Sequence, residues 1–397
     1  LHSTIELEHD LSNNLSSRQE NPLHVHANQD LVTQPGEMEG WNLPHNRRAS
    51  FHNLHRIVRY GFSVRAPDVL KLTSCTDERI SQLDSVQKLC NANIFSAMVV
   101  LRGDQLIYEQ YAPDFAPHQA HTIMSITKTM THLIVGRCVE DGLIDLNAKV
   151  RDYLPEIGSG YADAAIQNVL DMNVVNDYSE DYSDPHTTAL NHNTSMGWRL
   201  PAADTRLTSN REFLCTIKSD DLLNRSGEVN YKSASTDVLA WIAERVSGQS
   251  LRDHFVSIVE AVGIEHIFHM STDHTGIPNT NGGVCLSARD LARFGLVFTR
   301  QCQGIRGERV GSHSFMNAAR GCTGPVYPSP DNHIHYGNQL MTNGRWIGHG
   351  GWGGQLLIVD PETATVVVFF SVLENQSASD DNHKREIVRM AEEVIGY

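Results

Sequence analysis

A serine and a lysine lie three residues apart in the stretch Ser125-Ile126-Thr127-Lys128. On a helix, residues i and i+3 share one face, so the two side chains would lie side by side. A serine hydroxyl becomes a good nucleophile only when a neighbouring base takes its proton, and a desolvated lysine amine can act as that base. At a helix start, the main-chain N–H of Ser125 would also be free to bind an oxyanion. The pair therefore predicts acyl transfer, although S-x-x-K alone is expected by chance in a chain of this length.

Tyr231 lies just before the segment SASTDVLAWIAERV, whose apolar pattern predicts a helix over 233–247. A tyrosine at such a loop-to-helix junction can aim its phenol at a nucleophile and carry protons when a nearby cation lowers its pKa. The alternative for this motif taken alone is a half-buried tyrosine beside a helix cap, with Ser233 or Ser235 as the cap.

The run HGGWGG at residues 349–354 leads into the apolar segment QLLIVD, which predicts a strand. Glycines let a substrate approach the main chain closely. The N–H of Trp352 is a candidate second oxyanion donor beside that of Ser125, and each such donor typically contributes about 3–4 kcal/mol in the transition state. The glycines also match G-x-G-x-x-G, but a dinucleotide site needs that pattern to open a helix, and here it opens a strand.

The elements that must position these residues follow from the spacing of apolar residues. An early β-hairpin is predicted, with strands over 96–102 and 106–111 joined at Gly103-Asp104. Two further strands are predicted near the other end, over 355–360 and 365–373. Helices are predicted at 77–93, from Ser125 to Gly142, and at 164–172, 233–247, 286–300 and 381–395.

This order predicts an α/β plus all-α fold, in which an antiparallel sheet flanked by helices is built from both chain ends and carries an inserted helical domain. We expect residues 41–124 and 325–397 to form the sheet domain and residues 125–324 the mainly helical one, with the active site at their interface. Residues 1–40 show no sustained periodicity. We interpret them as an N-terminal arm that wraps the body or the partner subunit of a homodimer, or as a disordered extension.

The bulk composition excludes several classes of partner. A net charge of -15 argues against nucleic acids and anionic membranes, because both attract clustered Lys and Arg. Seven cysteines without a C-x-x-C pair favour a reducing, cytoplasmic location, although the chain begins at Leu1 and an export signal already removed stays open. No apolar run reaches the length of a membrane span. His24-x-His26 and His333-x-His335 lack the context of a metal site, and we expect neither a metal nor a cofactor.

Taken together and in this order, S-x-x-K, Y-x-S and H-x-G resemble the serine β-lactamase and DD-peptidase superfamily. Within it, the chain is most similar to the class C-like branch that contains the 6-aminohexanoate-dimer (nylon-oligomer) hydrolases and related esterases. The segments WNLPHNRRASFHN, VLDMNVVNDYSEDYSDP and YKSASTDVLAW carry that likeness, which covers about residues 41–397. The resemblance implies an α/β domain and an all-helical domain with the active site between them.

The resemblance also implies catalytic roles. Ser125 would be the nucleophile, and Lys128 and Tyr231 would be its base and acid. The main-chain N–H groups of Ser125 and Trp352 would form the oxyanion hole. The sequence leaves open whether Lys128 or Tyr231 is the base, because the two groups would titrate together.

Substrate-binding residues follow from the same likeness. A loop tyrosine closes over the substrate amide in the nylon-oligomer enzymes, and Tyr182 matches it here, with Tyr178 as the reserve. Together with Tyr182, we expect His349, Gly350 and Gly351 to contact the substrate. His349 stands where penicillin-binding enzymes usually have a lysine that recognises the substrate carboxylate, which disfavours β-lactam and D-Ala-D-Ala substrates.

We therefore expect a serine hydrolase that cleaves a small or oligomeric amide or ester through an acyl-enzyme on Ser125. The alternatives are a biosynthetic transacylase on the same scaffold, a β-lactamase or DD-peptidase, and a catalytically inactive binding module.

Overall fold

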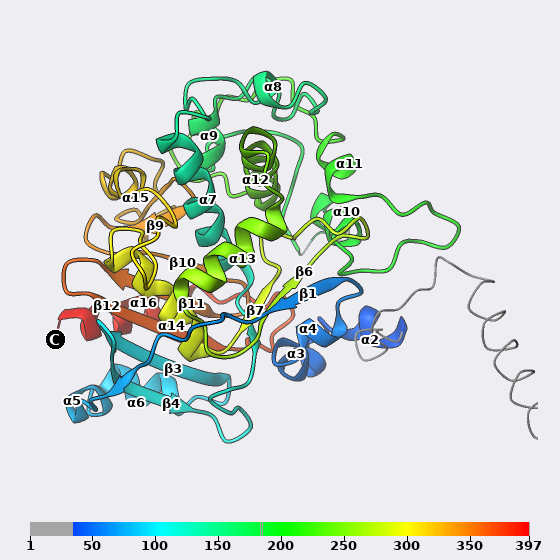
Figure 1. Cartoon of the computed structure of the whole chain (residues 1–397). Coiled ribbons are helices and arrows are strands. Elements are labelled where there is room, and N and C mark those ends of the chain that lie inside the picture. Colours follow the sequence, from blue (N-terminus) through cyan, green and yellow to red (C-terminus); the bar gives the residue numbers. More distant parts are fainter. Residues whose placement is uncertain (1–34, 183, 185, 397) are drawn as a thin grey trace, which may run out of the picture.

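The computed structural model describes residues 35–182, 184 and 186–396. Two β-sheets and the helices around them make up this part of the chain (Figure 1). The larger sheet has eight strands in the order β2-β4-β3-β12-β11-β10-β9-β8, and its neighbours are antiparallel except for β2 and β4. In that order the strands are Thr73–Ser74, Gln105–Tyr111, Phe95–Arg102, Thr365–Ser371, Gln355–Asp360, Ile347–Gly351, Leu340–Thr342 and His335–Gly337.

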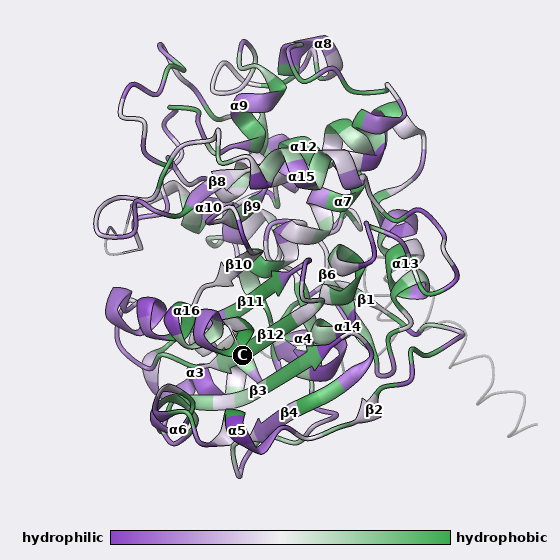
Figure 2. Cartoon of the chain, turned by 90° about the vertical axis from the view of Figure 1, so that its left-hand side faces the viewer, coloured by the Kyte–Doolittle hydropathy of each residue, from purple (hydrophilic) through white to green (hydrophobic). Residues whose placement is uncertain are grey.

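The centre of the larger sheet is buried on both faces. β3, β11 and β12 are rich in Val, Leu, Ile and Phe, which pack well on a pleated surface. α14 (Ala288–Thr299) places Gly295 against Val366, and α16 (Asp381–Gly396) places His383 near Phe369. Strand side chains alternate between faces, so the two helices cover opposite sides of the sheet. Figure 2 shows the hydrophobic residues concentrated in β11 and β12.

The smaller sheet holds the segment that carries Ser125. Its order is β1-β6-β7-β5, with strands Gly61–Val64, Phe268–Ser271, Val284–Leu286 and His121–Thr122. After β5, Ile123 donates its main-chain N–H to the carbonyl of Val284 at 3.0 Å. The chain then enters the 3-10 helix η3 (Met124–Thr127) and continues as α7 (Lys128–Glu140). Ser125 is therefore held between a sheet edge and the start of a buried helix.

The remaining helices surround these sheets. They are α2 (Pro35–Gly40), α3 (Pro44–Phe51), α4 (Leu54–Ile57), α5 (Glu78–Ser81), α6 (Asp84–Cys90), α8 (Val150–Tyr153), α9 (Ile166–Leu170), α10 (Thr188–Ser195), α11 (Asn210–Leu214), α12 (Ser233–Ser247), α13 (Leu251–Val262) and α15 (His313–Arg320). Among the described residues, no helix is long and apolar enough to cross a membrane.

The predicted antiparallel sheet built from both chain ends is confirmed, because β3 pairs with β12 from Arg102↔Thr365 to Ala97↔Phe370. Two local predictions are wrong. The helix predicted at 77–93 is two helices, α5 and α6, because Leu83 between them is extended with ψ 127°. The helix predicted to begin at Ser125 begins at Lys128, and Ser125 lies on the 3-10 turn before it. The smaller sheet and strands β8 to β10 were not predicted.

The domain boundaries stay a prediction. α14 belongs to the segment 125–324, yet it packs on β3, β11 and β12 of the larger sheet. Of the predicted N-terminal arm 1–40, residues 1–34 lie outside the described residues, and Pro35–Gly40 forms α2.

Candidate active site

The structure brings the Ser125 hydroxyl and the Lys128 amine together. Lys128 Nζ donates to Ser125 Oγ at 2.9 Å. The same amine donates to Ser233 Oγ at 3.0 Å and to the main-chain carbonyl of Asn281 at 2.6 Å. Lys128 is fully buried at the first turn of α7. Three acceptors thus hold its amine beside the serine oxygen.

Burial changes the acidity of this amine. Removal from water lowers the pKa of Lys128 to about 8, while the negative charges of Glu180 and Asp237 act in the opposite direction. A lysine in water is almost entirely protonated at neutral pH. At Lys128 a usable fraction of the amine is neutral and can accept a proton from the serine.

Tyr231 completes the group from the end of a long loop. Its ring centroid lies 5.1 Å from Lys128 Nζ, and its ring packs at a right angle on Tyr336. The hydroxyl is buried, and none of the described hydrogen bonds engages it. Burial raises the pKa of the Tyr231 phenol well above its ordinary value and Glu180 adds to the rise, while the neighbouring Ser125 hydroxyl lowers it. Tyr231 is thus a neutral donor that faces the nucleophile without a fixed partner.

Strand β10 runs close beside η3. A Cβ atom added to Gly351 would lie 2.5 Å from the carbonyl oxygen of Ile123, so only glycine permits this approach. Ser125, Gly350, Gly351 and Trp352 line the same cleft. None of the described hydrogen bonds uses the main-chain N–H of Ser125 or Trp352. Both predicted oxyanion donors therefore lie beside the cleft with their N–H groups unengaged.

His349 lies beside Tyr231 but is not a cation. Burial and the charge of Lys128 lower the pKa of His349 to about 3, although a hydrogen bond to the Gly350 carbonyl acts against this. That carbonyl can only accept, so Nδ1 carries the proton over 2.6 Å, and Nε2 accepts from the Tyr336 hydroxyl at 3.1 Å. The imidazole of His349 is therefore neutral and hydrogen-bonded at both nitrogens, so it offers no positive charge to a substrate carboxylate.

The loop tyrosines lie in different environments. Tyr182 is 43% exposed, and its ring centroid lies 5.6 Å from that of Trp352 at the cleft wall. Tyr178 is buried, and its hydroxyl bonds to His192 Nδ1 at 2.9 Å. The structure places Tyr182 at the wall of the larger cleft, while Tyr178, although buried, lines a smaller recess that also reaches Ser125.

The cleft has two parts, both lined by Ser125. The larger, of about 1620 Å³ including space open to solvent, contains Ser125, Tyr231 and the glycine segment of β10. A smaller recess, of about 490 Å³ also including space open to solvent, reaches Ser125 and is walled by Trp41, Trp198 and Trp352. Among the described residues, no group of three or more His, Cys, Asp or Glu side chains is arranged to hold a metal ion.

Sequence reasoning missed the residues that support the site from behind. Lys232 donates to the carbonyls of Tyr178 at 2.6 Å and Asn176 at 3.3 Å, which ties down the cleft loop. Asp237 and Asn281 form a buried network behind Lys128. A signal for Asp237 was present, since it lies four residues after Ser233 on one face of the predicted helix. Asn281 carries no local signal, because its role rests on a main-chain carbonyl.

The fold and the Ser125–Lys128 pair identify the family to which the chain belongs. The family model for Beta-lactamase matches residues 96–390, and the chain belongs to this family of serine hydrolases. It has the β-lactamase/transpeptidase-like fold.

Comparison with individual proteins shows which members of the family the chain resembles. The chain is 33% identical over 356 residues, 84% of this chain and 87% of the relative, to the 6-aminohexanoate-dimer hydrolase of Paenarthrobacter ureafaciens. A Bacillus anthracis protein assigned provisionally as a 6-aminohexanoate-dimer hydrolase has the same fold, with a TM-score of 0.78 at 22% identity over 92% of this chain and 97% of that one. EstCE1, a hydrolase with promiscuous acyltransferase activity, shares the fold at a TM-score of 0.56 and 16% identity over 80% of this chain and 97% of its own.

Proposed function

We propose that the protein hydrolyses linear amides of small or oligomeric substrates through an acyl-enzyme on Ser125. The observation that carries this proposal is the 2.9 Å contact between Lys128 Nζ and Ser125 Oγ at the cleft, with the pKa of Lys128 lowered to about 8. A nucleophile paired with a base of matched pKa is the requirement for acyl transfer.

Lys128 fits the role of base better than Tyr231. Its neutral form is accessible near pH 8, whereas the raised pKa of Tyr231 keeps that phenol protonated. Ser125 Oγ attacks the carbonyl carbon while Lys128 takes its proton. The oxyanion forms between the N–H groups of Ser125 and Trp352, which stabilise it without reorganisation.

Tyr231 carries the proton that the leaving amine needs and accepts one from the attacking water. As the C–N bond breaks, the Tyr231 phenol protonates the leaving amine and becomes a phenolate beside the Lys128 ammonium. A water then attacks the acyl-enzyme and gives its proton to the phenolate. The Lys128 ammonium returns its proton to Ser125 Oγ as the carboxylic acid leaves, and the site is restored.

The substrate class rests on two supports. The relative with 33% identity is named for hydrolysis of the 6-aminohexanoate dimer, a linear amide. His349, which is neutral and fully engaged, offers no charge for the carboxylate of a β-lactam. Both favour a linear amide over a penicillin-type substrate.

The test is intact-protein mass spectrometry after exposure to an aryl ester, an anilide amide and nitrocefin, with Ser125→Ala as the matched control. We expect an acyl adduct with the ester and the amide on the wild type and none on Ser125→Ala. A fluorophosphonate probe should label the wild type at Ser125. Absence of both adduct and label would refute the proposal and favour an inactive binding module. An adduct with nitrocefin alone would refute the linear-amide assignment.

A further inference from the structure

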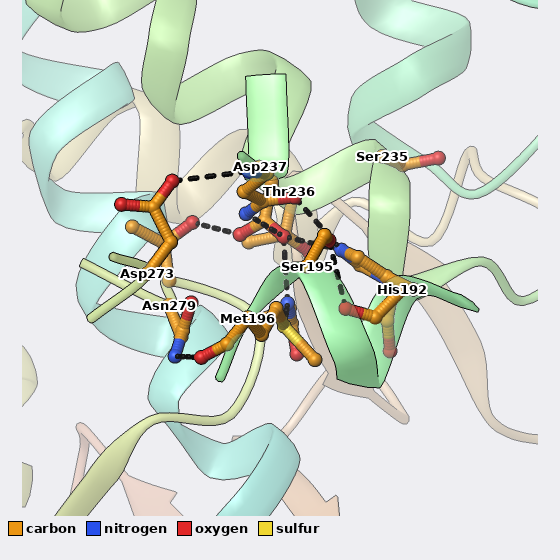
Figure 3. A network of polar contacts seen from close by, with 12 residues as sticks. His192, Ser195, Met196, Ser235, Thr236, Asp237, Asp273 and Asn279 are labelled. Carbon is orange, nitrogen blue, oxygen red and sulfur yellow. Dashed lines mark hydrogen bonds and ion pairs between the residues drawn. The ribbon is translucent and has the colours of Figure 1, made fainter. Parts of the chain in front are cut away.

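A buried carboxylate lies behind the candidate active site. Asp237 projects from α12, and its side chain is 3% exposed. Its two oxygens accept four hydrogen bonds, on Oδ1 from Thr280 Oγ1 at 2.6 Å and on Oδ2 from Asn281 Nδ2 at 2.6 Å, Asn210 Nδ2 at 3.0 Å and His192 Nε2 at 3.0 Å. Figure 3 shows His192 and Asp237 within this network, with its hydrogen bonds and ion pairs as dashed lines.

Asp237 carries a negative charge in the interior. Burial acts to raise its pKa, but hydrogen bonding and the charge of His192, together with Asn210 and Thr280, outweigh it and hold the pKa of Asp237 below its ordinary value. In the part of the chain that the structure describes, no lysine or arginine forms an ion pair with it. A buried anion that is paired with a histidine, and with no lysine or arginine, is costly to keep charged, so its position calls for a function.

The network leads directly to Lys128. Thr280 and Asn281 are both fastened to Asp237 through their side chains. The main-chain carbonyl of Asn281 accepts the shortest of the three hydrogen bonds from Lys128 Nζ, at 2.6 Å. The negative charge of Asp237 also raises the pKa of Lys128 against the effect of burial. Asp237 thus acts on the position of the amine through Asn281 and, together with Glu180, on its charge.

The other end of the network reaches the cleft loop. His192 Nε2 must donate to Asp237, since a carboxylate only accepts, and its Nδ1 bonds to the Tyr178 hydroxyl at 2.9 Å. Tyr178 lies four residues before Tyr182, which lines the cleft. The carboxylate is therefore the shared anchor of the base and of a cleft wall.

Resting on the proposed function, the geometry points to Asp237 as a positioning residue for Lys128 that holds the Asn281 carbonyl against the amine and supplies a buried negative charge close to it. The other titratable groups that act on this amine are Tyr231, His349 and Glu180, and His192 of α10 contacts Asp237 itself. Without the charge of Asp237, burial acts on Lys128 with less opposition, and the amine becomes a weaker base.

The variant Asp237→Asn isolates the charge. Three N–H donors converge on one oxygen and a single hydroxyl on the other, so an asparagine can keep its carbonyl toward the three donors. Its new NH₂ group can donate to Thr280 Oγ1, which can reverse its role. The network therefore tolerates this substitution sterically.

The measurement is the acylation rate of Ser125 by an aryl ester as a function of pH, beside the ¹³C shift of the Lys128 side chain in protein labelled at lysine. We expect the titration midpoint of the Lys128 amine to fall by about one pH unit in Asp237→Asn, because the variant lacks an anion that favours the ammonium form. We expect the plateau rate to fall about tenfold, because a weaker base takes the proton less readily.

Asp273→Asn is the matched control. Asp273 is another buried carboxylate, and it accepts the main-chain N–H of Asn210 but forms no bond with Thr280 or Asn281. We expect this variant to lose stability and to keep the wild-type midpoint. An unchanged midpoint in Asp237→Asn, or an equal shift in both variants, overturns the inference.

Two further outcomes are decisive. If Asp237→Asn does not fold, Thr280→Val tests the inference instead. This variant removes the hydrogen bond from Thr280 to Asp237 and keeps the negative charge of Asp237. A fall of about threefold or more in its acylation rate supports the inference, since a lost hydrogen bond typically contributes about 1 kcal/mol, and an unchanged rate overturns it. Absence of acylation in the wild type refutes the proposed function instead, so the two failures are distinguishable.

Discussion

The Lys128 amine is the residue on which the proposed chemistry depends most. Burial lowers its pKa to about 8, and acylation requires the neutral form. Below that pKa the amine is protonated and cannot act as base, so we expect kcat/KM to rise with pH and to level off above about 8. Lys128→Met should lower kcat/KM by about 10²–10⁴-fold and remove this limb of the profile. A wild-type profile that stays flat across the Lys128 pKa would contradict the assignment.

Tyr231 is expected to matter in proportion to the basicity of the leaving group. An amine must be protonated as it departs, whereas a nitrophenolate leaves without help. Tyr231→Phe should therefore lower anilide hydrolysis by about 10²–10⁴-fold and nitrophenyl-ester hydrolysis by less than about tenfold. Parallel steady-state assays of the two substrates measure this ratio.

The control for Tyr231 is Tyr161→Phe, since Tyr161 is a fully buried tyrosine whose hydroxyl bonds to Ser235. It should change stability and leave the ratio of amide to ester rates at the wild-type value. Equal losses on both substrates in Tyr231→Phe would show that the phenol positions the site and does not protonate the leaving group.

At the scale of elements, the close approach of β10 to η3 places the candidate oxyanion donors together. Gly351→Ala would put a Cβ atom 2.5 Å from the Ile123 carbonyl, so the strand must move away from the nucleophile. We expect a loss of about 1–3 kcal/mol in the free energy of unfolding from this overpacking. We also expect a loss of activity in protein that is still folded, because Trp352 moves with the strand. Thermal unfolding and ester turnover measure the two effects.

Gly350→Ala is the matched control for stability. A Cβ atom there meets no other atom closer than 3.9 Å, which is ordinary contact. Its unfolding temperature should stay near the wild-type value. Equal destabilisation by the two substitutions would mean that the loss reflects glycine itself and not the contact with η3.

At the scale of the whole molecule, long elements with strong patterns were predictable and short ones were not. β3, β11 and β12 carry long, mostly apolar runs, so their pairing across both chain ends followed from the sequence. The smaller sheet has strands of two to four residues, too few to show a period.

The site divides in the same way. S-x-x-K, Tyr231 and the glycine run are local motifs, and the structure brings them to one cleft. The network around Asp237 joins His192, Asn210 and Thr280, which lie far apart in the sequence. No local sequence pattern around any of them indicates a shared partner. Only the folded chain shows that these side chains share one buried carboxylate.

Arg47 connects the two ends of the described chain to the cleft. It is 1% exposed and donates to the carbonyls of Leu373 and Asn375, beyond β12, and to Asn42. Its guanidinium carbon also lies 5.4 Å from the ring centroid of Trp352. Arg47→Met would leave the buried Leu373 carbonyl without this donor at a cost of about 1–3 kcal/mol, and the partly buried bonds to Asn42 and Asn375 would add less. We therefore expect a loss of about 2–4 kcal/mol in unfolding free energy by urea denaturation.

The neighbouring arginine gives the control for this last prediction. Arg48 forms its ion pair with Asp114, whose side chain is 53% exposed, and donates to the more accessible carbonyls of Phe95 and Asn93, so Arg48→Met should cost only about 1–2 kcal/mol. Equal losses would mean that charge, and not the buried hydrogen bonds, sets the stability. Because Arg47 also packs on Trp352, Arg47→Met should lose turnover at temperatures where it is still folded, and Arg48→Met should not. That difference would show that the packing of the chain ends maintains the oxyanion side of the cleft.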